Sequence, residues 1–124
     1  AAVELGTAFV AVEEGERVLR TNHFLSAELR DDTLPPDDDR IAANSEQRRA
    51  FLSRRLPALT GDVAEVMALM ARHTDDAGAP APVCQHAEGA EAQTLSSVVY
   101  SVRDRCLYFH EGTPCLGTWK RFAL

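Results

Sequence analysis

The chain has 124 residues, of which 45% are apolar and 26% are charged, an ordinary composition for one soluble globular domain. Its formal net charge of −6 argues against nucleic acid and anionic membrane surfaces as partners. No apolar run approaches the roughly 20 residues of a transmembrane helix, and the first residues lack the features of a signal peptide. Three cysteines is an odd count, which favours a reducing compartment, so we expect a cytoplasmic protein.

Strand-like residues open the chain. Residues 3–12 are rich in apolar and β-branched types, with Gly6 as a bend. An acidic turn signal at residues 13–16 predicts a β-hairpin over residues 8–21. A long acidic connection with consecutive prolines follows at about residues 25–44. Because strand-like residues begin so early and no initiator Met precedes them, we expect a processed chain or one piece of a larger fold.

Two helices are predicted in the middle of the chain. Ser45 is a candidate N-cap for the first helix, and Pro57 should end that helix near Leu56. Asp62 opens the second helix, and Glu65 follows three residues later, as in a capping box. Apolar residues then recur at the spacing of a core-facing helix: Val63, Val66, Met67 and Met70.

The last third of the chain has the pattern of a small antiparallel sheet. After a second loop region at residues 74–93, β-branched residues predict a strand at 94–102 and a return strand at 106–110. A short terminal strand is expected within residues 119–124. Because strands and helices are segregated along the chain, we predict an α+β fold of antiparallel hairpins and two helices, in a single unit spanning residues 1–124.

The polar run at residues 20–24, where the first hairpin should end, is a candidate site. A strand exit can present a fixed side chain to a ligand, and the Asn22 amide could stabilise a developing oxyanion. Arg48 is a second candidate, because a guanidinium near a thiol lowers the pKa of that thiol. The alternatives are a solvated loop with an Asx turn at Asn22, and an ordinary surface cation at Arg48.

Cysteine and histidine side chains offer two further kinds of site. Cys84 with His86 or His73 is a candidate thiolate–imidazole pair, although its flanking residues do not resemble a known nucleophile setting. Five residues are candidate zinc ligands: His73, Cys84, His86, His110 and Cys115. The Cys-x-His spacing is one residue short of the usual first half of a zinc motif, and no second tight pair exists. We therefore predict neither a metal nor a cofactor.

Five blocks together carry a family resemblance. In chain order they are Arg20-Thr21-Asn22-His23-Phe24-Leu25, Ser45-Glu46-Gln47-Arg48, Cys84-Gln85-His86, residues 94–99 with Leu107-Tyr108, and Gly112-Thr113-Pro114-Cys115 with Trp119. Their order resembles the C-terminal half of N-terminal-nucleophile (Ntn) cysteine hydrolases of the isopenicillin N acyltransferase and carcinine hydrolase type, distant relatives of choloylglycine hydrolases. The resemblance runs from about Phe9 to Leu124, and Gln85 replaces the family's arginine.

The resemblance implies a four-layer αββα sandwich and an acyl transfer from small-molecule, non-peptide linear amides, to water or to another acceptor. It assigns catalytic roles to Asn22, as the residue that polarises the scissile carbonyl, and to Arg48, as the residue near the nucleophile. His23 and Phe24, which adjoin Asn22, are expected to bind substrate.

The family's nucleophile is an N-terminal cysteine freed by self-cleavage, whose own α-amine serves as the base. Here residue 1 is alanine and the first cysteine is Cys84. We therefore expect a second chain or segment that carries the nucleophile, or a self-dimer that covers the same apolar face, and we expect this chain to be inactive alone.

A non-catalytic binding or interaction module that keeps the same half-fold is the alternative. The enzyme hypothesis expects Asn22 and Arg48 within reach of one cleft, whereas the binding-module hypothesis expects the two side chains to lie apart or to be filled in by neighbours.

Overall fold

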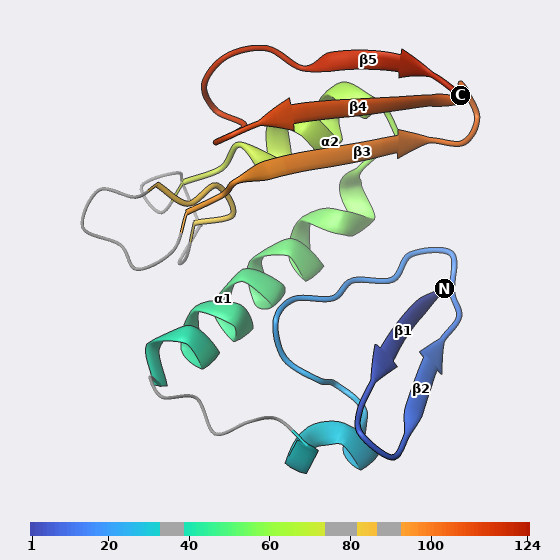
Figure 1. Cartoon of the computed structure of the whole chain (residues 1–124), viewed down its shortest axis with the longest axis vertical. Coiled ribbons are helices and arrows are strands. Elements are labelled where there is room, and N and C mark those ends of the chain that lie inside the picture. The colour runs from blue at the N-terminus through green and yellow to red at the C-terminus, as the bar shows by residue number, and fades with distance from the viewer. Residues whose placement is uncertain (33–38, 74–81, 87–92) are drawn as a thin grey trace. The chain divides into compact units, whose positions relative to one another are not determined.

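The computed structural model describes residues 1–32, 39–73, 82–86 and 93–124, and it is an α+β structure with two helices and two antiparallel sheets (Figure 1). The predicted fold class is confirmed at this level. The chain divides into two compact units, unit 1 before Ala58 and unit 2 from Ala58 onward. That the two units form one domain stays a prediction.

The sheet of unit 1 is a hairpin of β1 (Ala2–Leu5) and β2 (Val10–Glu13). The turn between the strands is closed by the Gly6 N–H, which donates to the Phe9 carbonyl over 2.9 Å. The predicted hairpin over residues 8–21 is therefore wrong. Gly6 is the turn itself, whereas residues 14–20 form no strand.

Cross-strand pairing explains why the chain turns at Gly6. The register places Val3 opposite Val12 and Leu5 opposite Val10, so two apolar pairs form on one face of the hairpin. A hairpin that turned at residues 13–16 would form neither of these two apolar pairs. These four side chains are more than half exposed, so this face of unit 1 is apolar and open.

The helix of unit 1, α1 (Asp39–Arg55), begins seven residues earlier than predicted, because a helix capped by Ser45 would begin at Glu46. Ser45 is not its N-cap: it lies inside the helix and is 1% exposed. The helix ends at Arg55 and passes into the 3₁₀ turn η2 (Leu56–Ala58), which confirms the stop expected from Pro57.

The predicted acidic connection at residues 25–44 is shorter than expected. Its first part forms the 3₁₀ helix η1 (Ala27–Asp32) and its last part belongs to α1. Residues 33–38 lie outside the described part of the chain. Among the side chains that the structure describes in unit 1, Leu29 of η1 and Phe51 of α1 are the large ones that are completely buried.

Unit 2 begins with α2 (Val63–Met70), and the predicted N-cap is confirmed. The Asp62 carboxylate accepts the Ala64 N–H over 2.8 Å. The other half of the expected capping box differs, because Glu65 accepts from the Thr60 N–H and hydroxyl, at 2.8 and 2.9 Å, rather than from the Asp62 N–H. Thr60, which precedes α2, is thus hydrogen-bonded to the first turn of that helix.

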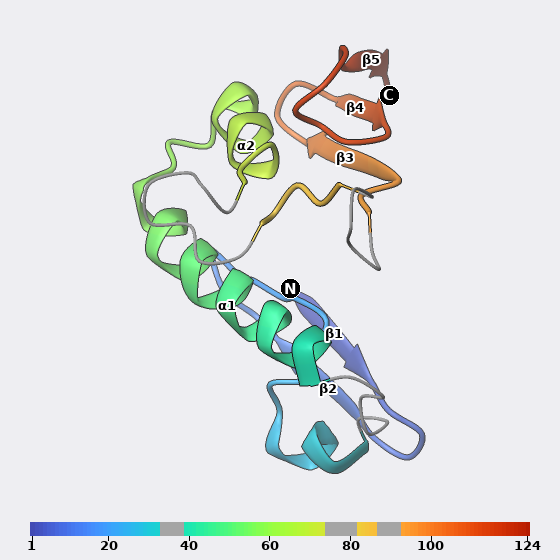
Figure 2. The ribbon, with the colours of Figure 1, turned by 90° about the vertical axis from the view of Figure 1, so that its left-hand side faces the viewer.

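Three antiparallel strands follow in the order β3-β4-β5: β3 (Ser96–Ser101), β4 (Cys106–Glu111) and β5 (Lys120–Ala123). They confirm the predicted second hairpin and terminal strand. Helix α2 contacts β3 and lies on one side of this sheet (Figure 2), which is the side on which Ser97 and Val99 are buried.

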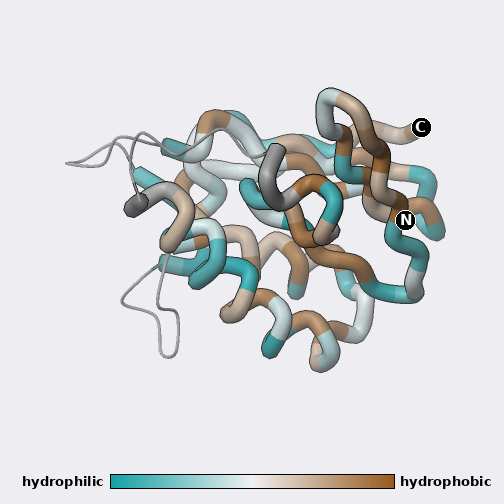
Figure 3. Tube along the Cα trace, turned by 90° about the horizontal axis from the view of Figure 1, so that it is seen from below, coloured by the Kyte–Doolittle hydropathy of each residue, from teal (hydrophilic) through white to brown (hydrophobic). Residues whose placement is uncertain are grey.

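The opposite face of this sheet carries an open apolar row. Tyr100, Leu107 and Phe122 lie opposite one another on the three strands, and Tyr100 and Phe122 are exposed. Figure 3 colours the chain by the hydropathy of each residue, with hydrophobic residues in brown. In the part of the chain that the structure describes, no helix is both long and apolar enough to cross a membrane.

The two faces of β3 generate a matched test of this packing. Val99→Ala should lower the free energy of unfolding by about 2 kcal/mol, because it removes two methyl groups from a buried site. Val98→Ala, on the exposed face of the same strand, should cost less than about 0.5 kcal/mol. Urea titrations followed by the fluorescence of Trp119 measure both values. Equal losses would show that α2 does not cover this face.

Candidate functional site

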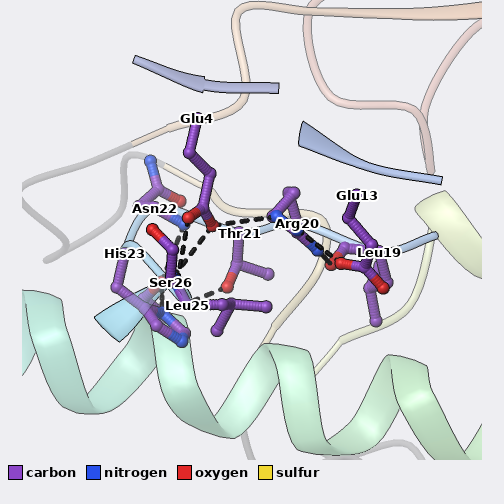
Figure 4. Close-up of polar contacts among 10 residues, drawn as sticks. Glu4, Glu13, Leu19, Arg20, Thr21, Asn22, His23, Leu25 and Ser26 are labelled. Atoms are coloured by element: carbon purple, nitrogen blue, oxygen red, sulfur yellow. Dashed lines mark hydrogen bonds and ion pairs between the residues drawn. The ribbon is translucent and has the colours of Figure 1, made fainter. Parts of the chain in front are cut away.

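Residues 20–26 of unit 1 lie between the hairpin and α1, where Figure 4 draws their polar contacts. A hollow of about 340 Å³ opens beside them. Its lining comes from β1 and from the predicted polar run: Val3, Glu4, Leu5, Arg20, Thr21, Asn22, His23 and Phe24. The structure therefore places this run at a concave surface, and the contacts on either side of the run decide how it is held.

A buried carboxylate holds one end of the run. Glu4, which is 5% exposed, accepts the Leu25 N–H over 2.8 Å and the Ser26 N–H over 3.0 Å (Figure 4). Its carboxylate also lies 2.9 Å from Nε of Arg20, and Arg20 forms a second ion pair with Glu13. Glu4 thus binds the chain on both sides of Asn22 and His23.

These contacts act on the pKa of Glu4. Burial alone would raise it, but the N–H groups of Ser26 and Leu25, together with the charge of Arg20, outweigh burial and lower the pKa from 4.5 to about 2. The carboxylate is therefore ionised at neutral pH and stabilises the folded form of unit 1.

A buried hydroxyl holds the middle of the run from the opposite side. The Asn22 N–H donates to Oγ of Ser45 over 2.8 Å, and Nδ1 of His23 lies 2.8 Å from the same oxygen. The Thr21 hydroxyl is 3.2 Å from that nitrogen. Ser45 therefore fixes the run to α1. Because it is 1% exposed, Ser45 is out of reach of a substrate and is no nucleophile.

The two predicted catalytic residues are in contact. Nη2 of Arg48 donates to Oδ1 of Asn22 over 2.6 Å, and Nε of Arg48 donates to Oδ1 of Asn44 over 2.8 Å. Partial burial lowers the pKa of Arg48, yet a guanidinium stays protonated in proteins. The enzyme hypothesis expected Asn22 and Arg48 within reach of one cleft, and the two side chains do lie together. Their catalytic roles stay predictions.

This contact fixes the orientation of the Asn22 amide. Arg48 has donors and no acceptor, so it binds the amide oxygen and leaves the Nδ2 group to face elsewhere. Among the described residues, Nδ2 has no hydrogen-bond partner, and Asn22 is exposed. The arrangement therefore offers an oriented N–H donor with a cation behind it.

His23 and Phe24 are half-buried and line the hollow. Nδ1 of His23 is occupied by the two hydroxyl contacts, so Nε2 is the ring nitrogen left for a ligand. Their assignment to substrate binding stays a prediction.

In unit 2 the structure brings together four of the five candidate zinc ligands. Ligand atoms of His73, Cys84, His86 and Cys115 lie within 4.8 Å of one another. His110 is not a member of this cluster; it is buried and packs edge-on against Trp119, with ring centroids 5.3 Å apart.

The alternative use of Cys84 as a nucleophile loses support. Burial raises the pKa of its thiol to about 11, although the backbone N–H of Cys115 acts in the opposite direction. A buried, protonated thiol is a poor nucleophile at neutral pH. Residues 1–57 contain no cysteine, so the hollow of unit 1 has no thiol of its own.

Sequence reasoning missed Glu4 and misassigned Ser45. The signal for Glu4 was present: a carboxylate between Val3 and Leu5 sits on the face opposite those two side chains in a strand, and here that face is the buried one. Ser45 gave no comparable signal, because a serine within a helix is ordinary unless its partner, the Asn22 N–H, is known.

Comparisons with known proteins give no significant match to a family model, a curated protein or a solved structure. The family resemblance therefore rests on the five sequence blocks alone.

The Glu4 contacts predict an acid-sensitive unit 1. Since the folded pKa of about 2 lies below the ordinary value of 4.5, the stabilisation is complete above about pH 5 and is lost as pH falls toward 2. Glu4→Gln should remove this part of the pH dependence, measured by urea unfolding between pH 2 and 7. Glu16→Gln, at an exposed position, is the control. An unchanged pH profile in Glu4→Gln would refute the assignment.

The Ser45 contact predicts a local effect on the run. Ser45→Ala should speed hydrogen exchange of the Asn22 amide about tenfold, because the N–H loses a bond worth about 1–2 kcal/mol. Ser53→Ala, at an exposed position on α1, should leave that amide unchanged. Equal exchange rates in the two variants would mean that Ser45 does not hold the run.

Proposed function

We propose that this chain is part of a cysteine-dependent amidohydrolase or acyltransferase that acts on linear, non-peptide amide bonds. The observation that carries the proposal is the contact between Asn22 and Arg48 at a hollow lined by β1 and residues 20–24. These two side chains are the ones to which the family resemblance assigns catalytic roles.

Asn22 stabilises the oxyanion in this proposal. As a thiolate attacks the amide carbon, the carbonyl oxygen gains charge, and the Nδ2 group of Asn22 donates a hydrogen bond to it. Arg48 is a positioning residue: it binds Oδ1 of Asn22, holds the amide in one orientation and increases the polarity of its N–H bonds. Asn44 fixes Arg48 in turn.

The thiol comes from a second chain or segment whose first residue is cysteine. Its sulfur bonds to the acyl carbon, the C–N bond breaks, and the leaving amine takes the proton held by the α-amino group. Water then hydrolyses the thioester, or another acceptor takes the acyl group. His23 and Phe24 bind the substrate beside Asn22.

The open surfaces of both units support an assembly of this kind. Asn22 is exposed, and an oxyanion site works best when water is excluded. Each unit also presents an uncovered apolar sheet face, as a sheet does before a second sheet packs on it. In the proposed four-layer αββα sandwich these faces are interior. A self-dimer would cover the same faces without supplying the cysteine.

The three free cysteines in the described structure support a reducing compartment, and we place the assembly in the cytoplasm. A non-catalytic binding module is the second candidate, favoured by the absence of any cysteine from residues 1–57. In that case residues 20–24 bind a small polar ligand in the hollow without turning it over.

The test is turnover by the assembled protein. The chain is purified with its cysteine-bearing partner and assayed against a panel of small N-acyl amides. Asn22→Ala should lower turnover by ~10²–10³, because one oxyanion donor is lost. Unfolding measurements should show almost no change, since Asn22 is exposed. Arg54→Ala, at an exposed position on the same helix as Arg48, is the matched control and should keep full activity.

Unchanged turnover in Asn22→Ala would refute the assigned role. Binding of the amides without turnover by any assembly, with no alkylatable N-terminal cysteine in the mass spectrum, would favour the binding module instead.

A further inference from the structure

The Cys/His cluster of unit 2 is built from three separate places in the chain. His73 follows α2, Cys84 and His86 lie in the segment 82–86, and Cys115 lies in the turn between β4 and β5. Cys84 is 1% exposed, and the other three side chains are half-buried. Four ligand-type atoms thus converge in the interior of unit 2.

We propose that these four side chains bind one Zn²⁺ in a tetrahedral, structural site. Zinc bonds of about 2.3 Å to sulfur and about 2.0–2.1 Å to nitrogen place two sulfurs about 3.8 Å apart, two nitrogens about 3.3 Å apart, and a sulfur and a nitrogen about 3.6 Å apart. We depart here from the sequence-based expectation of no metal, and the inference does not depend on the proposed acyl transfer.

The observed distances follow this pattern. The sulfurs of Cys84 and Cys115 are 3.5 Å apart, and the Nε2 atoms of His73 and His86 are 3.1 Å apart. Nε2 of His86 lies 3.2 Å from the sulfur of Cys115 and 3.7 Å from that of Cys84. Each of these four edges of the tetrahedron is therefore within a few tenths of an ångström of the value that zinc requires, and the two edges from His73 to the sulfurs are at most 4.8 Å long.

Hydrogen bonding alone does not account for this convergence. A neutral imidazole nitrogen carries one hydrogen or one lone pair, directed in the plane of the ring. Nε2 of His86 nevertheless has three neighbours at hydrogen-bond distance, two of them sulfurs, which are weak partners. A cation at the centre attracts one lone pair from each of the four side chains, and so it explains why all four point to one place.

Charge and coordination both favour zinc in a structural role. Two thiolates and one Zn²⁺ sum to zero charge, so the occupied site buries no net charge. Two sulfurs and two nitrogens in a tetrahedron are ligands typical of zinc. Four protein ligands leave no open position for water or substrate, which marks a structural site rather than a catalytic one.

The backbone holds the ligands in place without the metal. The Arg72 carbonyl accepts the N–H groups of Val83 and Cys84, at 3.1 and 2.9 Å, which brings the segment 82–86 to the end of α2. Gln85 and Thr94 exchange two further bonds, Gln85 N–H to the Thr94 hydroxyl and Thr94 N–H to the Gln85 carbonyl. The metal would thus join α2, this segment and the turn after β4.

A disulfide between Cys84 and Cys115 is the competing explanation. Its S–S bond is about 2.05 Å, whereas the two sulfurs are 3.5 Å apart and both cysteines are free. A disulfide would also leave the convergence of His73 and His86 unexplained.

The first test is the metal content of the untagged wild-type protein. After incubation with ZnCl₂ and removal of excess metal, elemental analysis should find one Zn²⁺ per chain. Replacement by Co²⁺ should give the intense visible bands of tetrahedral cobalt and a thiolate-to-metal charge-transfer band in the near ultraviolet. Chelation should lower the urea midpoint reported by Trp119, which lies in unit 2.

The second test uses matched variants. Cys84→Ser and Cys115→Ser should each weaken zinc binding at least about tenfold, because each removes one of four ligands. Cys106→Ser replaces the third cysteine, and His110→Gln replaces the buried histidine outside the cluster; both should bind one Zn²⁺. Circular dichroism checks that each variant is folded.

Three results would overturn the proposal. They are wild-type protein that takes up no zinc, a Co²⁺ spectrum without tetrahedral or thiolate bands, and a folded Cys84→Ser variant that binds zinc as tightly as the wild type. A wild-type mass two daltons below that of the fully reduced chain, with Cys84 linked to Cys115, would assign the cluster to a disulfide.

Discussion

The buried carboxylate of Glu4 is the contact on which the arrangement of unit 1 depends. It accepts two consecutive backbone N–H groups, from Leu25 and Ser26, and pairs with Arg20, so one side chain of β1 fixes a segment more than 20 positions away. Without this carboxylate the two N–H groups would lose their partner, a cost of about 1–3 kcal/mol for each unsatisfied group, and Arg20 would keep its ion pair with Glu13.

The contact of Ser45 with residues 20–24 adds to that of Glu4. Ser45 holds the Asn22 N–H from α1 while Glu4 holds the residues that follow, so the run between them is fixed from two sides. Only then can Arg48 and Asn44 orient one side-chain amide. An oxyanion donor contributes because its position is set before the reaction begins. The position of the exposed Asn22 amide thus depends on contacts of Ser45 and Glu4, two buried side chains.

The sequence predicted unit 2 better than unit 1, and the reason is the range of the interactions. Asp62 caps α2 through the N–H of the residue two positions later, and four residues join β3 to β4; both interactions are local and leave a pattern in the sequence. In unit 1 the competing turns at Gly6 and at residues 13–16 each contain one glycine, and cross-strand pairing decided between them.

The candidate sites also differ in how far apart in the sequence their interacting residues lie. The order of short blocks along the chain predicts a site with Asn22 and Arg48, whereas the same pattern predicts a helix cap at Ser45, which instead accepts the Asn22 N–H. The convergence of His73 and Cys115 could not be read from spacing, because 41 residues separate them and the contact exists only once α2, the segment 82–86 and the sheet of unit 2 have folded. Motifs in which ligands come in tight pairs are visible in a sequence; sites assembled from single ligands are not.

The most direct test of the proposed catalytic roles is a double-mutant cycle on turnover by the assembly proposed above. Asn22→Ala, Arg48→Ala and the double variant are compared with the wild type at saturating substrate. If Arg48 acts by orienting the Asn22 amide, the double variant turns over no more slowly than Asn22→Ala alone, because the group that Arg48 positions is already gone. Losses that multiply would mean that the two residues act independently, and would contradict the account.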